Sequence, residues 1–179
     1  MTFDKQLDFD IQEESEQDLA GIRLVQRLAF QRDDEADVVD RLRENCPVFI
    51  SLVAKIGDKV VGHILFTPAR LIQNQGWSIE GLGLAPLAVL PEYQKQGIGT
   101  GLCIEGLTRA ALAGYPFVVV LGDSAYYPRF GFKPASTYGI QCAYEDIPDE
   151  AFMIKMLKPK IMTGVEGVVY YRQEFDSVS

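Results

Sequence analysis

Three glycines lie within five residues in the stretch Gln94 to Gly101, QKQGIGTG, directly after an apolar run and directly before another. The first amides of a helix have no intrahelical partners, and that end of the helix carries about half a positive charge. Because glycine has no Cβ, a phosphate can come close to such a backbone. The stretch therefore predicts an anion-binding turn at the start of a helix, the alternative being a tight strand-to-helix turn without a ligand.

Two common phosphate motifs fit the stretch poorly. A Walker loop needs GxxxxGK[ST], and neither the lysine nor the hydroxyl follows here. A dinucleotide-binding turn would put its third glycine at Leu102, and residues 91–96 separate the preceding strand from the first glycine. A nucleotide-dependent oxidoreductase is therefore a weak alternative, although Asp123 follows the next strand, where a ribose-binding acid could lie.

The cysteines and the overall charge narrow the classes of function. Cys46, Cys103 and Cys142 are odd in number and widely separated, which predicts buried thiols rather than disulfides or a metal site. The formal net charge of -8 argues against a nucleic-acid partner. Residues 91–133 nevertheless contain four basic and three acidic residues, so the glycine stretch lies in the least acidic part of the chain.

The length and composition indicate one folded unit. At 179 residues, 47% of them hydrophobic and 23% charged, the chain is expected to form a single domain spanning 1–179. The chain contains no run of about 18 apolar residues, so no membrane span is predicted. The acidic N-terminal segment has no apolar secretory core, so a cytoplasmic protein without membrane partners is expected, either a monomer or a homodimer.

Hydrophobic periodicity predicts a mixed α/β fold. Gly81, Gly83 and Pro86 predict that the strand containing them is irregular, and FVVVL at 117–121 predicts a strand buried on both faces. Helices are expected at 19–29, at 33–45 and from the glycine stretch to 111. Strands are expected at 7–11, 49–56, 60–71, 76–90, 117–121, 138–144, 151–157 and within 167–175.

Two motifs together resemble a known superfamily. LAPLAVLPEYQKQGIGTG, followed about 30 residues later by YYPRFGFKP, is similar to the acetyl-CoA signature of the GCN5-related N-acetyltransferases, and most closely to their bacterial YhbS-type branch. The resemblance is detailed over residues 80–135. It implies an acyl-CoA N-acyltransferase fold with a mostly antiparallel sheet of about seven strands, splayed between strands 4 and 5 and flanked by about four helices.

The resemblance also implies a cosubstrate, acetyl-CoA, and the residues that bind it. Pantetheine would lie along Leu87, Ala88 and Val89 like an extra strand, and the Val89 amide would face the thioester carbonyl oxygen. The pyrophosphate would bind at Gln94, Lys95, Gln96, Gly97, Ile98, Gly99, Thr100 and Gly101. Many members place Asn-x-x-Ala before the next motif, but Val120 and Asp123 occupy those positions here, so that contact is expected to be either absent or replaced by Ser124.

Acyl transfer to an amine poses two proton-transfer problems. The departing thiolate would be met by Tyr127, the second aromatic residue of YYPRFGF, by resemblance to the superfamily's tyrosine. The alternative is that Tyr127 only packs in the core. A protonated alkylamine must also lose a proton, and the candidate bases are Glu80, Glu92, Asp123 and His63, acting directly or through water.

The expected reaction is direct transfer of an acetyl group from acetyl-CoA to an amine of a small molecule or a protein. Residues 1–50, which include the two helices that would wall the acceptor pocket, contain 13 acidic and 6 basic residues. This excess favours a cationic acceptor. The alternative function is a non-catalytic acyl-CoA-binding sensor or interaction domain.

Overall fold

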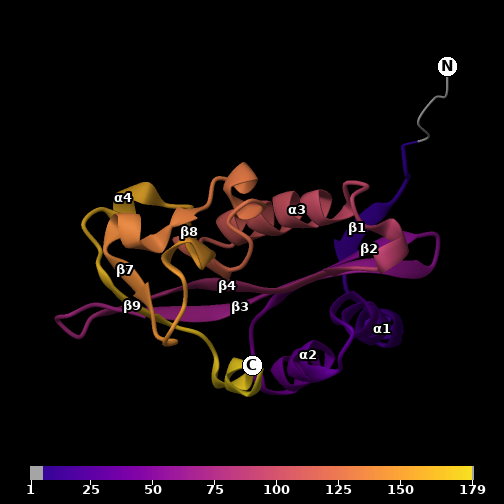
Figure 1. Ribbon diagram of the computed structural model, residues 1–179, viewed down its shortest axis with the longest axis horizontal. Coiled ribbons are helices and arrows are strands. Elements are labelled where there is room, and N and C mark those ends of the chain that lie inside the picture. The colour runs from indigo at the N-terminus through magenta and orange to yellow at the C-terminus, as the bar shows by residue number, and fades with distance from the viewer. Residues whose placement is uncertain (1–5, 179) are drawn as a thin grey trace.

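The computed structural model describes residues 6–178, whose centre is a twisted sheet of nine strands (Figure 1). The sheet order is β1-β2-β3-β4-β5-β8-β6, and β9 pairs with β3 and β7. All pairs are antiparallel except β4–β5 and β7–β9. The strands are β1 (Asp10–Glu13), β2 (Ile50–Ile56), β3 (Lys59–Ile72), β4 (Ser78–Val89), β5 (Phe117–Leu121), β6 (Lys133–Pro134), β7 (Ile140–Cys142), β8 (Phe152–Met156) and β9 (Gly167–Tyr170).

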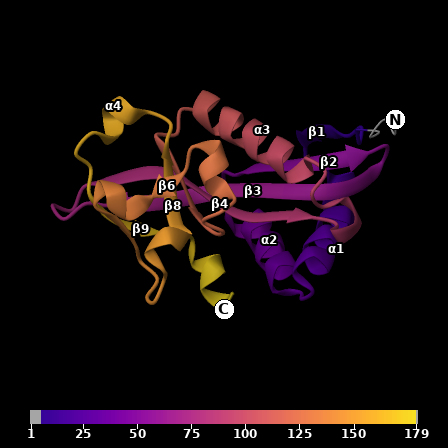
Figure 2. The same ribbon diagram turned by 45° about the horizontal axis from the view of Figure 1, so that its top comes forward.

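Helices cover both faces of the sheet. Figures 1 and 2 show α1 and α2 together on one face and α3 on the other. The α-helices are α1 (Leu19–Phe30), α2 (Asp34–Asn45), α3 (Ile98–Leu112) and α4 (Pro159–Met162), and short 3-10 turns include Pro91–Tyr93, Tyr127–Phe130 and Gln173–Ser177. None of the helices within 6–178 is both long and apolar enough to cross a membrane.

The third helix lies very close to the sheet. A Cβ at Gly106 would overlap the ring of Phe66 on β3, and a Cβ at Gly62 on β3 would lie 2.8 Å from Ile98 Cγ2. Small residues on both elements therefore allow the close approach. Ile98 and Leu102 are 1% and 0% exposed, so the first turn of α3 is anchored in the core.

The long strands β3 and β4 carry a bulge where the sequence contains proline. Their register is regular from Ile72↔Ser78 to Phe66↔Leu84 and resumes at Ile64↔Leu87. Ala85 and Pro86 thus lie opposite Leu65 alone, and proline is tolerated because it has no amide to contribute to the ladder.

The sheet splays immediately before this bulge. β4 pairs with β5 only at Leu82↔Val118 and Gly83↔Val119, whereas β5 continues alongside β8 up to Leu121↔Phe152. The opening therefore lies between the bulged half of β4 and the end of β5. This is the splay expected between the fourth and fifth strands.

Most predicted elements are confirmed, with four differences. The first strand begins at Asp10 rather than residue 7, and α3 already begins at Ile98, inside the glycine stretch. Residues 6–178 form nine strands, whereas the resemblance implied about seven and periodicity predicted eight; the strand that periodicity missed is β6, which is only two residues long. The glycines of β4 do not interrupt its pairing with β3. A Cβ at Gly81 or Gly83 would instead lie within 2.7 Å of the ring of Phe117 or Tyr171, so packing requires glycine at both positions.

Candidate active site

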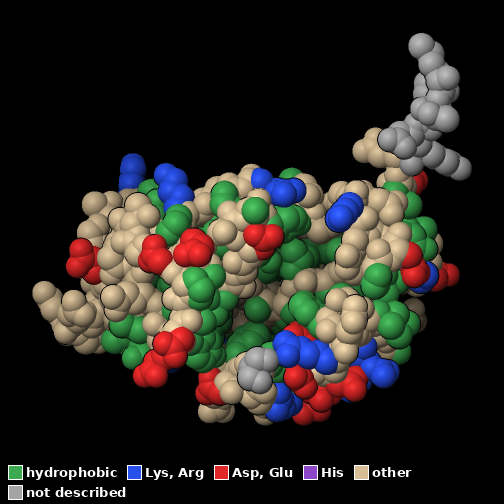
Figure 3. All heavy atoms as spheres, viewed as in Figure 1, with side chains coloured by type: hydrophobic (Ala, Val, Ile, Leu, Met, Phe, Trp, Pro, Cys, Tyr) green, Lys and Arg blue, Asp and Glu red, His purple; other side chains and the backbone are tan. Residues whose placement is uncertain are grey.

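A cavity of about 510 Å³ opens at the splay between β4 and β5. Figure 3 shows this face hollowed where hydrophobic side chains gather beside the C-terminal residues. The cavity joins segments far apart in the chain, from the end of α1 to residue 178. Its lining residues are Phe30, Glu35, Val38, Leu84, Ala85, Pro86, Leu87, Leu121, Gly122, Asp123, Tyr126, Tyr127, Phe175 and Val178.

Tyr127 lines this cavity from the turn that follows β5. Its ring makes edge contacts with Tyr126 and Phe132, at centroid distances of 5.1 and 5.8 Å, and it lies against the Cα of Gly122, where a Cβ would overlap it. No hydrogen-bond partner of its hydroxyl lies within residues 6–178. Burial raises the pKa of Tyr127 well above its ordinary value, so the phenol remains protonated at neutral pH.

The glycine stretch forms the N-terminus of α3. Gly97 is the N-cap residue with φ +90°, a region that favours glycine, and a Cβ there would meet no atom within 4 Å. Among the described residues, no acceptor takes the amide hydrogens of residues 95–100, because the first helical bond runs from Gly101 N to Gly97 O, at 3.0 Å. These consecutive free amides and the helix dipole create a site for an anion.

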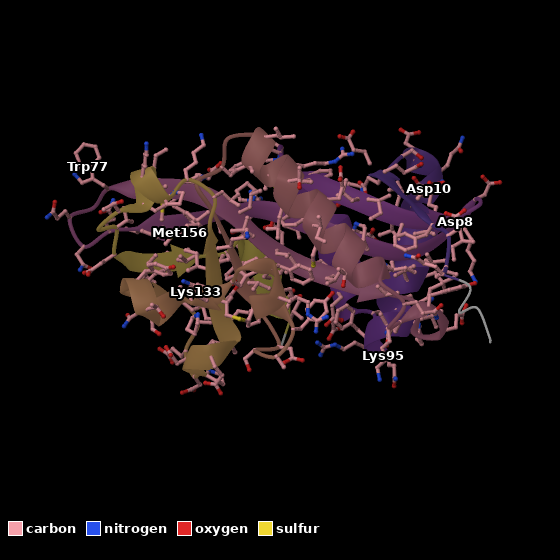
Figure 4. The ribbon with its side chains drawn as sticks, turned by 90° about the horizontal axis from the view of Figure 1, so that it is seen from above. Asp8, Asp10, Trp77, Lys95, Lys133 and Met156 are labelled. Carbon is pink, nitrogen blue, oxygen red and sulfur yellow. The ribbon has the colours of Figure 1, made fainter. Side chains whose placement is uncertain are left out.

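The two glutamines of the stretch hold it in place. Gln94 Nε2 donates to Val89 O at the end of β4 (3.0 Å), and Gln96 Nε2 donates to Glu92 O (3.0 Å). Their side-chain amide groups therefore fix the loop to β4 and to itself. Lys95 adopts a positive φ of 59°, and its side chain points away from the body of the molecule (Figure 4).

Gly101 does not contribute to the free amides, contrary to its expected place in the pyrophosphate site. Its amide is bonded to Gly97 O, and a Cβ would lie 3.0 Å from Ile11 Cδ1 and 3.3 Å from the Phe9 ring. Glycine at 101 thus makes room for the N-terminal strand. By contrast, a Cβ at Gly99 would lie 2.8 Å from the hydroxyl of Tyr126, which connects the start of α3 to the cavity wall.

The bulged half of β4 presents one unpaired edge. Leu87, Ala88 and Val89 pair with β3 on one side, and β5 does not reach them on the other. Leu90 N donates to Val61 O on β3, so by strand alternation the backbone groups of Leu87 and Val89 face away from β3. Val89 O accepts from Gln94 Nε2, which leaves the Leu87 groups and the Val89 amide facing the opening. Ser124 is exposed and does not line the cavity, and Val120 is buried in the core.

Of the four candidate bases, the structure brings only Asp123 to the cavity. Its Oδ1 accepts a hydrogen bond from Ala125 N (2.7 Å), and it has no cationic partner within residues 6–178. Glu80 lines a separate cavity of about 590 Å³ beside Arg70. Glu92 is exposed and forms an ion pair with Lys59 (3.1 Å).

His63 is excluded as a base that faces the cavity. It is fully buried beneath α1, with Nδ1 at 2.9 Å from Gln26 Nε2 and Nε2 at 2.8 Å from Ser51 Oγ. Ser51 Oγ donates to Glu14 Oε2 (2.6 Å), which Arg43 also binds. Burial lowers the pKa of His63 to about 4, despite the opposing effect of Glu14, so this imidazole is neutral and structural.

The acidic character of residues 1–50 is largely compensated in the fold. Arg23 pairs with Asp37 and Asp40, and Arg27 pairs with Asp33, at 2.6 to 2.7 Å. Figure 3 shows acidic and basic side chains intermixed along this side of the molecule. The acid excess counted along the sequence therefore does not create a bare acidic surface over α1 and α2.

Comparison with known proteins identifies the family. Residues 10–135 match the model of the acetyltransferase (GNAT) domain. The chain belongs to the GNAT acetyltransferase family. This GNAT chain is 36% identical over 160 residues to the uncharacterized N-acetyltransferase YhbS of Escherichia coli K12, covering 89% of the chain and 93% of YhbS. It is 40% identical over 155 residues to the uncharacterized N-acetyltransferase YjhQ of the same strain, covering 82% of the chain and 84% of YjhQ.

Two solved structures extend the similarity to three dimensions. E. coli YhbS in complex with CoA superposes with a TM-score of 0.88 at 35% identity, covering 98% of the GNAT chain and 96% of YhbS. A GNAT family acetyltransferase from Brucella melitensis in complex with acetyl-CoA superposes with a TM-score of 0.74 at 35% identity, covering 94% of the GNAT chain and 99% of the Brucella protein. The fold inferred from the two sequence motifs is thereby confirmed.

Several cavity residues carried no signal in the sequence. Glu35 lies in the first turn of α2 among other acids, and nothing in its spacing distinguishes it from them. Phe175 and Val178 lie in the C-terminal segment, where the sequence predicted only a strand within 167–175 and the structure has a 3-10 turn. Gly122 follows a buried strand as many turn glycines do, and only its contact with Tyr127 reveals why glycine is required there.

Proposed function

We propose that the protein transfers the acetyl group of acetyl-CoA directly to the amine of an acceptor. The observation that carries the proposal is that three parts of the site adjoin one another: the free amides at the start of α3, the open edge of β4, and the cavity with Tyr127. CoA and acetyl-CoA are bound in two similar structures, which supports this choice of cosubstrate. The pyrophosphate would lie at the amides of residues 96–100, and pantetheine beside Leu87 and Val89.

The neutral amine attacks the thioester carbonyl, the C–N bond forms, the nitrogen releases its extra proton to water, the C–S bond breaks, and CoA leaves as its thiolate. Tyr127 donates a hydrogen bond to the developing thiolate. Its raised pKa makes full proton transfer to a thiolate, whose conjugate acid has a pKa of about 8.5, unfavourable. We therefore assign Tyr127 to stabilising charge on the sulfur, with the proton supplied to the thiolate as CoA departs into water.

The amine must lose its proton before it can attack. For an alkylamine with a pKa of about 10.4, reaching the neutral form at pH 7 requires about 4.6 kcal/mol. Asp123, which lines the cavity, would accept a hydrogen bond from the ammonium group and orient it, with solvent taking the proton. An acyl-enzyme route has no nucleophile in the cavity, because no cysteine, serine or threonine among residues 6–178 lines it. Cys103 is fully buried, and burial raises the pKa of its thiol to about 12.

Two measurements test the proposal against its alternative, a non-catalytic acyl-CoA sensor. Thermal denaturation with acetyl-CoA, CoA and NAD should show stabilisation by the two CoA species alone. Thiol release from acetyl-CoA should then accelerate with an amine in the assay. Stabilisation by CoA species without acceptor-dependent thiol release on any amine would support the sensor, and stabilisation by NAD alone would refute both.

A further inference from the structure

The walls of the cavity point to a specific chemical class of acceptor. Beyond Tyr126 and Tyr127, they are supplied mainly by apolar side chains from separate elements. The largest are Phe30 at the end of α1, Leu84 and Leu87 on β4, Leu121 on β5 and Phe175 in the C-terminal segment. Apolar walls of this kind stabilise a ligand that has apolar surface to bury, and they disfavour one whose polar groups would lose their hydration.

The charges in the cavity are two carboxylates, only one of which lacks a cation. Glu35 accepts hydrogen bonds from Arg32, from Nε at 3.1 Å and from Nη2 at 2.5 Å, and its side chain is 10% exposed. Asp123 has one backbone hydrogen bond and no cationic partner among residues 6–178. The cavity thus accommodates one positive charge, at the end where Asp123 and Tyr127 lie.

The rest of this side of the molecule offers little attraction to further positive charges. The acids at the start of α2 are engaged by Arg23 and Arg27, and mixed charges cover that surface (Figure 3). A polycation would therefore gain one ion pair in the cavity and no second acidic subsite. An amine with one charge and an apolar body would bury its body against the apolar walls and pair its charge with Asp123.

The C-terminal segment closes the cavity on one side. It is tied down by Arg172 to Glu174 (2.7 Å), by Tyr144 Oη to Asp176 (3.1 Å) and by Arg41 to Ser177 Oγ (2.5 Å). These bonds come from the loop after β7, from α2 and from the segment itself, and they position Phe175 and Val178 in the wall. A cavity of about 510 Å³ is the size of a small-molecule site.

We infer that the acceptor is a small primary amine with an alkyl or aryl body and no second charge, bound with its ammonium group at Asp123 and its apolar body against Phe30, Val38, Phe175 and Val178. This inference rests on the proposed transfer reaction. It defines the C-terminal segment as the part that determines which amine is used.

A panel of amines tests the inference. We expect kcat/KM to rise about fourfold for each added CH2 from butylamine to hexylamine, and 2-phenylethylamine to be among the best acceptors. Phenylalanine should be poor, because its carboxylate would lie beside Asp123. Spermidine and a lysine-containing peptide should be poor as well. Preference for spermidine or the peptide, or equal rates along the alkyl series, would overturn the inference while leaving the transfer reaction intact.

Substitutions locate the apolar body. Phe175→Ala and Phe30→Ala should each lower kcat/KM for 2-phenylethylamine about tenfold, with a smaller effect for butylamine. Trp77→Ala is the matched control and should leave both rates unchanged. This aromatic side chain is 73% exposed at the tip of the β3–β4 hairpin (Figure 4), and it does not line the cavity. Equal losses for both amines in the cavity variants would contradict the assigned position.

Calorimetry separates failure of the inference from failure of the proposed function. The same amines are titrated into the protein saturated with CoA. Affinity that rises with alkyl length, without acetylation of any amine, would support the apolar cavity and refute the transfer reaction. Affinity that is independent of alkyl length would overturn the inference whatever the rates are.

Discussion

At the scale of single residues, the position of Tyr127 depends on a neighbour that has no side chain. Gly122 allows the ring to lie against the backbone at the end of β5, while Tyr126 and Phe132 contact its edges. The hydroxyl is thereby directed to the cavity without a partner among the described residues. The phenol is therefore free to donate a hydrogen bond to a ligand in the cavity.

Replacing Tyr127 by phenylalanine removes only the hydroxyl. If the phenol stabilises the departing thiolate, kcat should fall at least tenfold while the KM for acetyl-CoA changes little, because the ring and its packing remain. Steady-state kinetics with a saturating amine would measure this. Tyr170→Phe is the control, since Tyr170 is 48% exposed on β9 and outside the cavity. Unchanged kcat in Tyr127→Phe would return this residue to a packing role.

His63, the only histidine in the chain, makes folding sensitive to acid. In the unfolded chain its pKa is about 6.5, and in the fold burial lowers it to about 4. Below pH 6.5 the unfolded chain takes up a proton that the folded chain does not bind. Stability is therefore lost as the pH falls from about 6.5 to 4, by about 3 kcal/mol in total.

Glu14 makes a further contribution at lower pH. Burial raises the pKa of its carboxyl, but hydrogen bonds from Arg43 and Ser51 outweigh burial, so the pKa of Glu14 in the fold is lowered. Protonation of Glu14 as the pH falls therefore adds to the loss of stability.

His63→Gln should make stability less dependent on pH. The variant is expected to be less stable at pH 7 because the glutamine cannot reproduce both hydrogen bonds. Between pH 7 and pH 5, however, it should lose about 2 kcal/mol less than the parent protein, because no imidazole titrates. Urea unfolding at the two pH values measures both quantities. The same loss in both proteins would mean that His63 is not the acid-sensitive group.

At the scale of elements, the start of α3 combines a positive-φ N-cap with a series of amides that no described residue accepts. Gly97→Ala should strain the turn by about 1 to 2 kcal/mol and raise the Kd for acetyl-CoA about tenfold. Gly76→Ala is a matched control, because Gly76 also has open space and a φ of +86°, but lies in the β3–β4 turn. Calorimetric titration of both variants measures the difference. Equal Kd values would indicate that the turn does not bind the cosubstrate.

At the scale of the whole molecule, α2 is joined to the sheet by an ion pair with little exposure. Arg43 donates to both carboxylate oxygens of Glu14, at 3.0 and 2.7 Å, and Glu14 in turn accepts from Ser51 on β2. The side chains of Arg43 and Glu14 are 20% and 12% exposed. This connection holds in place the helix that supplies Glu35 and Val38 to the cavity.

Arg43→Ala should reduce the free energy of unfolding by about 2 to 3 kcal/mol, because Glu14 would remain largely buried without its partner. Arg23→Ala is the control, since its pairs with Asp37 and Asp40 involve side chains 39 to 53% exposed and should contribute less than about 1 kcal/mol. Urea unfolding at pH 7 compares the two. A smaller loss in Arg43→Ala than in Arg23→Ala would contradict the role assigned to the buried pair.

The sequence by itself determined those features that depend on neighbouring residues. The glycine stretch at the start of a helix, the buried strand 117–121, the proline-containing bulge and the order of the main elements follow from local chemistry and periodicity. The two motifs around residues 80–135 also identified the family, because a backbone that approaches a ligand closely restricts the side chains allowed there.

Only the tertiary structure decided which residues meet in the cavity. It excluded Glu80, Glu92 and His63 from the cavity beside Asp123 and Tyr127, and added the C-terminal Phe175 and Val178 as walls. It also paired the acids of α2 with arginines, so the acid excess of residues 1–50, from which a cationic acceptor was expected, forms no bare acidic surface there. The physical reason is that cavities and ion pairs form between segments distant in sequence, whose relative positions depend on how the whole core packs.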